Sequence, residues 1–189
     1  AQMAPVVRLG PDGRREPAML RWGLVPGWAK DPKIGARLIN ARSDTVAVKP
    51  SFRAAFRKRR CLVPADGFYE WLAVGKLKQP YRMTLADGAP FAMAGLWESW
   101  RANTPDAIES FCIVTTSANE RLAEIHDRMP VILDAADYET WLCSNDEAER
   151  LGLLRPYPAE RTTYYAVSRR VNSPRFDDPE CIAPVAMSA

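Results

Sequence analysis

Residues 61–71 read Cys-Leu-Val-Pro-Ala-Asp-Gly-Phe-Tyr-Glu-Trp, which is two strand-like runs on either side of an Asp-Gly pair. The pair Asp66-Gly67 favours a turn, because glycine adopts the backbone conformations that tight turns need. The flanking runs predict strands near Arg60–Val63 and Phe68–Leu72. We therefore expect a framework of short strands joined by tight turns.

Glu70 lies in the second of these strands. Side chains alternate between the two faces of a strand, so Glu70 shares a face with Phe68 and Leu72. Tyr69 and Trp71 take the other face. Burial among apolar neighbours raises the pKa of a carboxyl group and makes it a usable acid near neutral pH. Glu70 is thus a candidate catalytic residue, and an ion pair with a nearby arginine is the structural alternative.

Similar signals punctuate the rest of the chain, which has 16 prolines, 10 glycines and further Asp-Gly pairs at 12–13 and 87–88. One pattern predicts a hairpin that joins Tyr81–Leu85 to Phe91–Ala94. Further strands are expected at Phe111–Thr115, Val131–Leu133 and Thr163–Val167. Capping residues predict short helices that begin after Ser51, Ser117, Asp134 and Ser144. Strands with intervening short helices indicate an α+β fold in one domain.

The composition excludes several classes of protein. A chain of 189 residues with 47% hydrophobic and 26% charged residues can bury a single core and is not disordered. It has no run of about 18 apolar residues that could span a membrane. The net charge of +3, from 26 Lys and Arg against 23 Asp and Glu, permits a nucleic-acid partner. The chain shows no secretory leader, so we expect a cytoplasmic protein that does not contact a membrane.

The four cysteines, at positions 61, 112, 143 and 181, are 51, 31 and 38 residues apart, so no Cys-x-x-Cys motif is present. We interpret them as reduced thiols. One histidine cannot build a histidine-rich metal site, and we expect neither a metal nor another cofactor. That histidine, His126, is the group most suited to titrate near neutral pH. Paired with Glu70, it would give one group that donates protons and one that accepts them.

Residues 38–44 read Leu-Ile-Asn-Ala-Arg-Ser-Asp. In an extended stretch Asn40 and Arg42 point to the same side, and the guanidinium group of Arg42 matches a phosphate. Capping of a turn is the alternative for Asn40. Two tryptophans flank a Pro-Gly turn further upstream. We interpret Trp22 as core-filling, whereas an exposed Trp28 could stack on a nucleic-acid base.

Six motifs occur in the order and at the spacing of one known family. They are Trp22-Gly23-Leu24-x-Pro26-x-Trp28, Asn40-Ala41-Arg42, Pro64–Trp71, Ala94–Glu98, His126–Pro130, and Val171-Asn172 with Pro179-Glu180. In these motifs the chain resembles the SRAP family of abasic-site processing proteins. The resemblance implies a single α+β domain, residues 1–189, with a curved, barrel-like core of mixed and antiparallel strands flanked by short helices.

The resemblance also implies an enzyme-like function in the DNA damage response. Members of the family bind single-stranded DNA and react with the aldehyde of an abasic site through an N-terminal cysteine, whose amine forms a Schiff base and whose thiol closes a thiazolidine. Carried over by motif, Asn40 positions the nucleophile, Glu70 transfers protons and His126 helps to open the sugar ring. The residues implied to contact DNA are Trp28, Arg42, Trp71, Thr115 and Arg128.

Family members begin Met-Cys-Gly-Arg, whereas this chain begins Ala-Gln-Met-Ala, so we expect that an N-terminal segment with the cysteine is missing from it. The chain as written is then expected to bind single-stranded DNA without forming the thiazolidine. An abasic-site protein of this kind can also show autoprocessing peptidase or lyase activity. Two alternatives are a non-covalent module that binds single-stranded DNA and a hydrolase, such as a peptidase, in which Glu70 and His126 activate water. The resemblance further implies a monomer, associated with the nucleoid if the source is bacterial.

Overall fold

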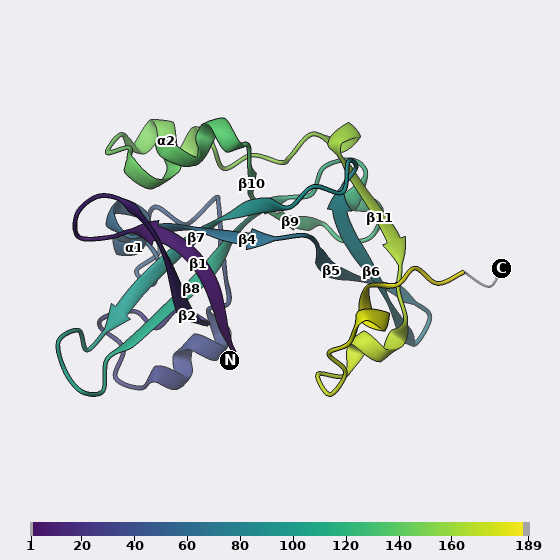
Figure 1. Cartoon of the computed structure of the whole chain (residues 1–189), viewed down its shortest axis with the longest axis horizontal. Helices are drawn as coiled ribbons and strands as arrows, with labels where there is room; N and C mark the ends of the chain where they lie inside the picture. Colours follow the sequence, from purple (N-terminus) through teal and green to yellow (C-terminus); the bar gives the residue numbers. More distant parts are fainter. Residues whose placement is uncertain (1, 187–189) are drawn as a thin grey trace. The chain divides into compact units, whose positions relative to one another are not determined.

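The computed structural model describes residues 2–186 (Figure 1). Contacts divide them into two compact units whose segments interleave along the chain. The first unit comprises the described residues up to Pro64, together with Phe91–Thr116 and Pro130–Pro156. The second comprises Ala65–Pro90, Ser117–Met129 and the described residues from Tyr157 onward. Short strands and short helical segments build both units, which confirms the predicted α+β class.

Most of the predicted strands are present. The strands are β1 (Met3–Leu9), β2 (Arg15–Trp22), β3 (Asn40–Arg42), β4 (Arg60–Ala65), β5 (Phe68–Val74), β6 (Leu77–Leu85), β7 (Phe91–Trp100), β8 (Ile108–Ser117), β9 (Arg128–Pro130), β10 (Ile132–Leu133) and β11 (Thr162–Ala166). The α-helices are α1 (Arg53–Lys58), α2 (Tyr138–Cys143) and α3 (Glu147–Gly152). The 3-10 helices are η1 (Pro32–Arg37), η2 (Leu122–Glu124), η3 (Ala135–Asp137), η4 (Ala159–Arg161), η5 (Arg169–Asn172) and η6 (Pro179–Ile182).

The core of the first unit is a ring of strands (Figure 1). Backbone hydrogen bonds join β7 to β4, β4 to β1, β1 to β2, β2 to β8 and β8 back to β7, so five strands close on themselves within the described residues. The strands β3 and β10 extend this sheet beside β8 and β7. Closure leaves fewer exposed strand edges, which protects the small sheet from pairing with other chains. The predicted barrel-like core is confirmed.

One buried arginine fastens the short helices to this ring. The guanidinium group of Arg60 donates to the carbonyl oxygens of Trp141 at 2.6 Å and of Leu142 at 2.9 Å, at the end of α2. It also donates to the carbonyl oxygen of Arg57 in α1, at 2.7 Å. Burial lowers the pKa of Arg60 to about 10. Arg60 thus satisfies carbonyl groups at the ends of two helices that are too short to be stable alone.

The second unit is built on a three-stranded antiparallel sheet in the order β11-β6-β5. The register places Glu70 of β5 opposite Tyr81 of β6, and Tyr81 opposite Ala166 of β11. These three side chains therefore share one face of the sheet, and Trp71 lies on the other face, opposite Pro80. The alternation predicted for Glu70 and Trp71 is confirmed.

Several local predictions are wrong. Ser51 does not cap α1, which has no side-chain cap, and the cap of α3 is Asp146 rather than Ser144. The predicted hairpin does not form, because its arms lie in different sheets: β6 pairs with β5 and β11, whereas β7 pairs with β8 and β10. The helix expected after Ser117 is the single 3-10 turn η2, and the amide of its first residue, Leu122, donates to Oδ1 of Asn119 at 2.9 Å. Asn119 also donates to the carbonyl oxygen of Tyr157 at 2.7 Å, and this contact holds the turn in place.

Candidate functional site

Glu70 and His126 lie side by side in the second unit. An oxygen of the Glu70 carboxyl group, Oε2, is 3.8 Å from Nδ1 of His126. Tyr81 of the neighbouring strand β6 lies on the same face of the sheet as Glu70, and Tyr81 is buried. The side chain of Glu70 is 23% exposed and that of His126 is 42% exposed. Both groups can therefore meet a substrate while their positions are set by the protein.

The environment of Glu70 favours its protonated form. Burial raises the pKa of Glu70, the positive charge of a protonated His126 opposes this shift, and the negative charge of Asp127 adds to it. A carboxyl group that keeps its proton at higher pH can donate it to a departing hydroxyl group and take it back afterwards. This is the chemistry predicted for Glu70 from the strand alternation.

The segment that follows η2 fixes the imidazole of His126. The backbone amide of His126 donates to the carbonyl oxygen of Leu122 at 3.0 Å, and the preceding residue, Ile125, is buried. The amide of Arg128 donates to Nδ1 of His126 at 3.1 Å, and an oxygen of Asp127 lies 3.5 Å from the same atom. Nδ1 also lies 3.1 Å from the carbonyl oxygen of Arg128. In the tautomer in which Nδ1 donates to that oxygen instead of accepting from the amide, Nε2 has a free lone pair that can take a proton.

Trp71, on the other face of β5, is held by a residue outside that sheet. Its indole Nε1 donates to Oδ1 of Asn172 at 2.7 Å, and Asn172 donates to the carbonyl oxygen of Lys78 at 3.3 Å. The indole is 36% exposed, so part of the ring is open to a partner. Arg128, in β9, is half-buried. The sequence indicated a role for Asn172 only through its place in the Val171-Asn172 motif of the family.

In the first unit, β3 presents Asn40 and Arg42 on the same outer side. Ala41 between them is fully buried, so the two flanking side chains point away from the core, as predicted. Parallel pairing with β8 places Arg42 opposite Thr115. The guanidinium group of Arg42 donates to both oxygens of Asp44, at 3.2 and 2.6 Å. A phosphate bound by Arg42 would compete with this exposed pair, which costs little to open.

The two tryptophans of the first motif are both exposed. Trp28 is 59% exposed, and its Nε1 donates to the carbonyl oxygen of Pro50 at 3.2 Å. This exposure suits the stacking predicted for Trp28. The interpretation of Trp22 as core-filling is wrong, because Trp22 is 38% exposed at the end of β2.

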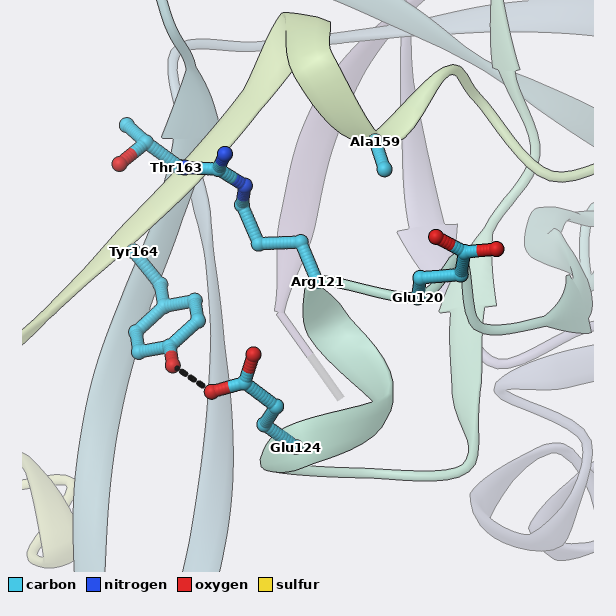
Figure 2. Close-up of a pocket in the computed structure, with 6 residues that line it drawn as sticks. All are labelled: Glu120, Arg121, Glu124, Ala159, Thr163 and Tyr164. Carbon is cyan, nitrogen blue, oxygen red and sulfur yellow. Dashed lines mark hydrogen bonds between the residues drawn. The ribbon is translucent and has the colours of Figure 1, made fainter.

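The second unit also has a polar hollow that was not predicted (Figure 2). It has a volume of about 510 Å³ and is lined by Glu120, Arg121, Glu124, Ala159, Thr163 and Tyr164. The hydroxyl group of Tyr164 in β11 donates to Glu124 of η2 at 2.6 Å, as Figure 2 shows, and this bond raises the pKa of Tyr164. The lining includes none of the predicted site residues.

The surroundings of three cysteines disfavour the reactive thiolate form. All four are free, and burial raises the pKa of Cys61 and of Cys112. The pKa of Cys143 is also raised, by desolvation and by the hydrogen bond that it donates to Glu139. Within residues 2–186 no three His, Cys, Asp or Glu side chains converge as a metal site would require. In the same residues no helix is both long and apolar enough to cross a membrane.

Comparisons with known proteins identify a family and relatives of this chain. Residues 1–174 match the family described as SOS response associated peptidase (SRAP). The chain is 46% identical, over 166 residues, to the abasic site processing protein YoqW of Bacillus subtilis (strain 168); the match covers 86% of this chain and 74% of YoqW. It is 34% identical to the abasic site processing protein HMCES of Xenopus tropicalis, over 90% of this chain and 58% of that protein.

A solved structure is similar to this chain in both fold and sequence. The X-ray crystal structure of a protein from Bacteroides thetaiotaomicron matches with a TM-score of 0.85 and 31% identity, over 97% of this chain and 82% of the other. Family model, relatives and fold all lead to one assignment, and the chain belongs to the SRAP family.

Proposed function

We propose that the protein recognises abasic sites in single-stranded DNA and links itself to them covalently. The relatives named as abasic site processing proteins support the substrate. The observation that carries the chemistry is the Glu70 carboxyl group, with its raised pKa, 3.8 Å from the single histidine. An abasic sugar exists as a closed hemiacetal and an open aldehyde, and both ring opening and attack by an amine require proton transfers.

Ring opening is the proposed task of His126. The imidazole takes the proton of the C1′ hydroxyl group, the bond between C1′ and O4′ breaks, and the imidazolium then gives that proton to O4′. The C1′ aldehyde that results is the electrophile for the next step. Part of the His126 side chain is exposed, which leaves its second ring nitrogen available to a substrate.

The covalent step needs an N-terminal cysteine, which we propose the natural protein carries ahead of the residues printed here. Its amine attacks C1′ of the aldehyde. Glu70 protonates the hydroxyl group of the adduct, which leaves as water, and then takes a proton from nitrogen to give the Schiff base. The thiol adds to the imine carbon, its proton passes to nitrogen, and a thiazolidine closes with the net loss of one water.

The remaining predicted residues are proposed to hold the DNA. Arg42 and Arg128 would bind phosphates, and the exposed rings of Trp28 and Trp71 would stack on or pack beside bases. Thr115, which pairs with Arg42 across β3 and β8, would contact the strand beside it. Asn40 would position the attacking amine through its side-chain amide, which both donates and accepts hydrogen bonds.

Two other functions remain as alternatives, each with its own signature. A non-covalent binding module would show DNA affinity that falls steeply with salt, but no adduct that survives denaturation. A hydrolase would use the same carboxyl group and imidazole to activate water, in keeping with the peptidase in the family description. It would cleave a peptide without retaining DNA, whereas a lyase would cleave the strand at the abasic site.

The substitution Glu70→Gln separates these functions. It preserves the size of the side chain and removes its ability to transfer protons. With the natural protein and an oligonucleotide that carries one abasic site, we expect the rate of adduct formation at saturating DNA to fall about 100-fold. Denaturing gels measure the rate, and fluorescence anisotropy should show affinity for intact single strands within about twofold of wild type, because no phosphate contact is lost.

A matched control is Glu147→Gln, since Glu147 is half-exposed and 4.0 Å from Arg57 on the first unit's surface. It should react at the wild-type rate. A Glu70→Gln protein that also reacts at the wild-type rate would remove Glu70 from the mechanism. A folded wild-type protein that forms no adduct would overturn the covalent function and leave the binding module or the hydrolase.

A further inference from the structure

Trp22 packs against Phe111 and is 38% exposed. It is the last residue of β2, and parallel pairing places it opposite Phe111 of β8. The two rings are nearly parallel, with 6.3 Å between their centres and an angle of 14° between their planes. Part of the Trp22 side chain is exposed, whereas Trp141 in the same unit is completely buried. Packing against Phe111 would be served as well by phenylalanine, so it does not explain a tryptophan.

The indole N–H supplies what phenylalanine lacks. Nε1 of Trp22 donates to the carbonyl oxygen of Ile39 at 3.0 Å. The backbone amide of Ile113 in β8 donates to the same oxygen at 3.1 Å. A carbonyl oxygen has two lone pairs, and both are used here. The peptide group that joins Ile39 to Asn40 is therefore held by two donors on different elements.

The orientation of that peptide group determines where the backbone of Asn40 lies and therefore from where its side chain extends. The group is planar, so fixing its carbonyl fixes the direction in which the chain enters Asn40. The strand β3 has only three residues and pairs with β8 alone at the edge of the sheet. The Ile39 side chain is 43% exposed and contributes little anchoring by burial. The Trp22 hydrogen bond is thus the side-chain contact that holds the start of this short segment, in addition to its pairing with β8 and the burial of Ala41.

The two residues after Trp22 make the arrangement rigid. The Gly23 amide donates to the carbonyl oxygen of Phe111 at 2.8 Å, and the Leu24 amide donates to that of Leu38 at 3.1 Å. Gly23 has a φ of +115°, and a Cβ atom there would lie 2.6 Å from the carbonyl oxygen of Gly35. The Trp-Gly-Leu motif therefore ties the end of β2 both to β8 and to the residues that lead into β3.

We propose that Trp22 is a positioning residue for Asn40, acting through the carbonyl group of Ile39. The inference rests on the proposed role of Asn40 in the covalent step. Its rival is direct stacking of a DNA base on the exposed part of the Trp22 ring. The two differ in what they require, because positioning needs the indole N–H and stacking needs only an aromatic ring.

The substitution Trp22→Phe retains the ring on Phe111 and removes the N–H. We expect the rate of adduct formation at saturating abasic DNA to fall about tenfold, the size expected for one lost hydrogen bond. Affinity for single-stranded DNA should stay within about twofold of wild type. In an Asn40→Ala background the same substitution should cause no further loss, because Trp22 acts on the reaction only through Asn40.

A matched control is Trp100→Phe. The indole of Trp100 also donates to a backbone carbonyl of this unit, that of Ala29 at 2.7 Å, and the residue is buried. Trp100→Phe should lower stability and leave the rate at saturating DNA unchanged. It separates loss of a specific N–H beside Asn40 from general weakening of the unit.

A second readout does not depend on the reaction. The side-chain amide signal of Asn40 in a nitrogen–proton NMR spectrum, assigned by its loss in Asn40→Ala, should shift in Trp22→Phe and not in Trp100→Phe. An unmoved Asn40 signal, a wild-type rate in Trp22→Phe, or additive losses in the double variant would overturn the proposal. Lost affinity at an unchanged rate would overturn it in favour of stacking. If wild type forms no adduct, the covalent function fails, and the Asn40 signal alone decides the role of Trp22.

Discussion

Glu70 illustrates how the position of one residue in a strand sets its chemistry. Alternation along β5 puts its carboxyl group on the face that carries buried Tyr81. Burial there raises its pKa, and the folded protein therefore binds this proton more tightly than the unfolded chain does. The stability that Glu70 contributes is fully present below the carboxyl pKa of the unfolded chain. It is lost as pH rises through the raised pKa of the folded state.

Glu70→Gln should therefore change stability in a pH-dependent way. Glutamine carries no charge at any pH, so the variant avoids the cost of burying a carboxylate above that pKa. We expect its free energy of unfolding, relative to wild type, to increase between about pH 4 and about pH 8. Denaturant titrations at the two pH values measure this difference. A difference that does not vary with pH would contradict the raised pKa, and Glu147→Gln serves as the exposed control.

At the scale of elements, local patterns predicted strands more successfully than their partners. The turn at Asp87-Gly88 forms, and Gly88 has a φ of +71°. Yet the strands on either side diverge, because β6 pairs with β5 and β11. Strand pairing depends on contacts between residues distant in the sequence, and a short window of residues does not encode it.

The same contrast between local and long-range information applies to the candidate site. Alternation sufficed to place Asn40 and Arg42 on one side and Glu70 on the apolar face. The support of these residues could not be predicted, because it comes from hydrogen bonds between distant positions. Trp22 and Ile39 are 17 residues apart, and Trp71 and Asn172 are 101 apart.

The close approach of Gly23 to Gly35 gives an element-scale prediction. Gly23→Ala places a Cβ atom 2.6 Å from a carbonyl oxygen at a φ of +115°, so the backbone must shift. We expect the free energy of unfolding to fall by about 3 kcal/mol. Gly27→Ala is the matched control in the same motif, because nothing lies within 4 Å of the added atom. Chemical denaturation compares them, and equal stabilities would contradict the tight contact.

At the scale of the whole molecule, the net charge is +3. Several of the positive charges form ion pairs with carboxyl groups inside the first unit. Arg8 bonds Glu16 and Glu109, and Arg59 bonds Glu98 at 2.6 Å. These pairs hold strands of the first unit together and leave that positive charge unavailable to a DNA strand. Composition alone therefore permits a nucleic-acid partner without identifying one. The functional assignment depends on the motifs and on the family that they define.

Intact mass spectrometry of the natural protein, after incubation with an oligonucleotide that carries one abasic site, tests the covalent function most directly. The expected product has the summed mass of protein and oligonucleotide less one water, because Schiff-base formation expels water and ring closure expels nothing. Peptide mapping should place the DNA on the N-terminal cysteine, and an undamaged oligonucleotide should give no product. Folded protein that remains unmodified, or DNA attached to any other residue, would contradict the proposed mechanism.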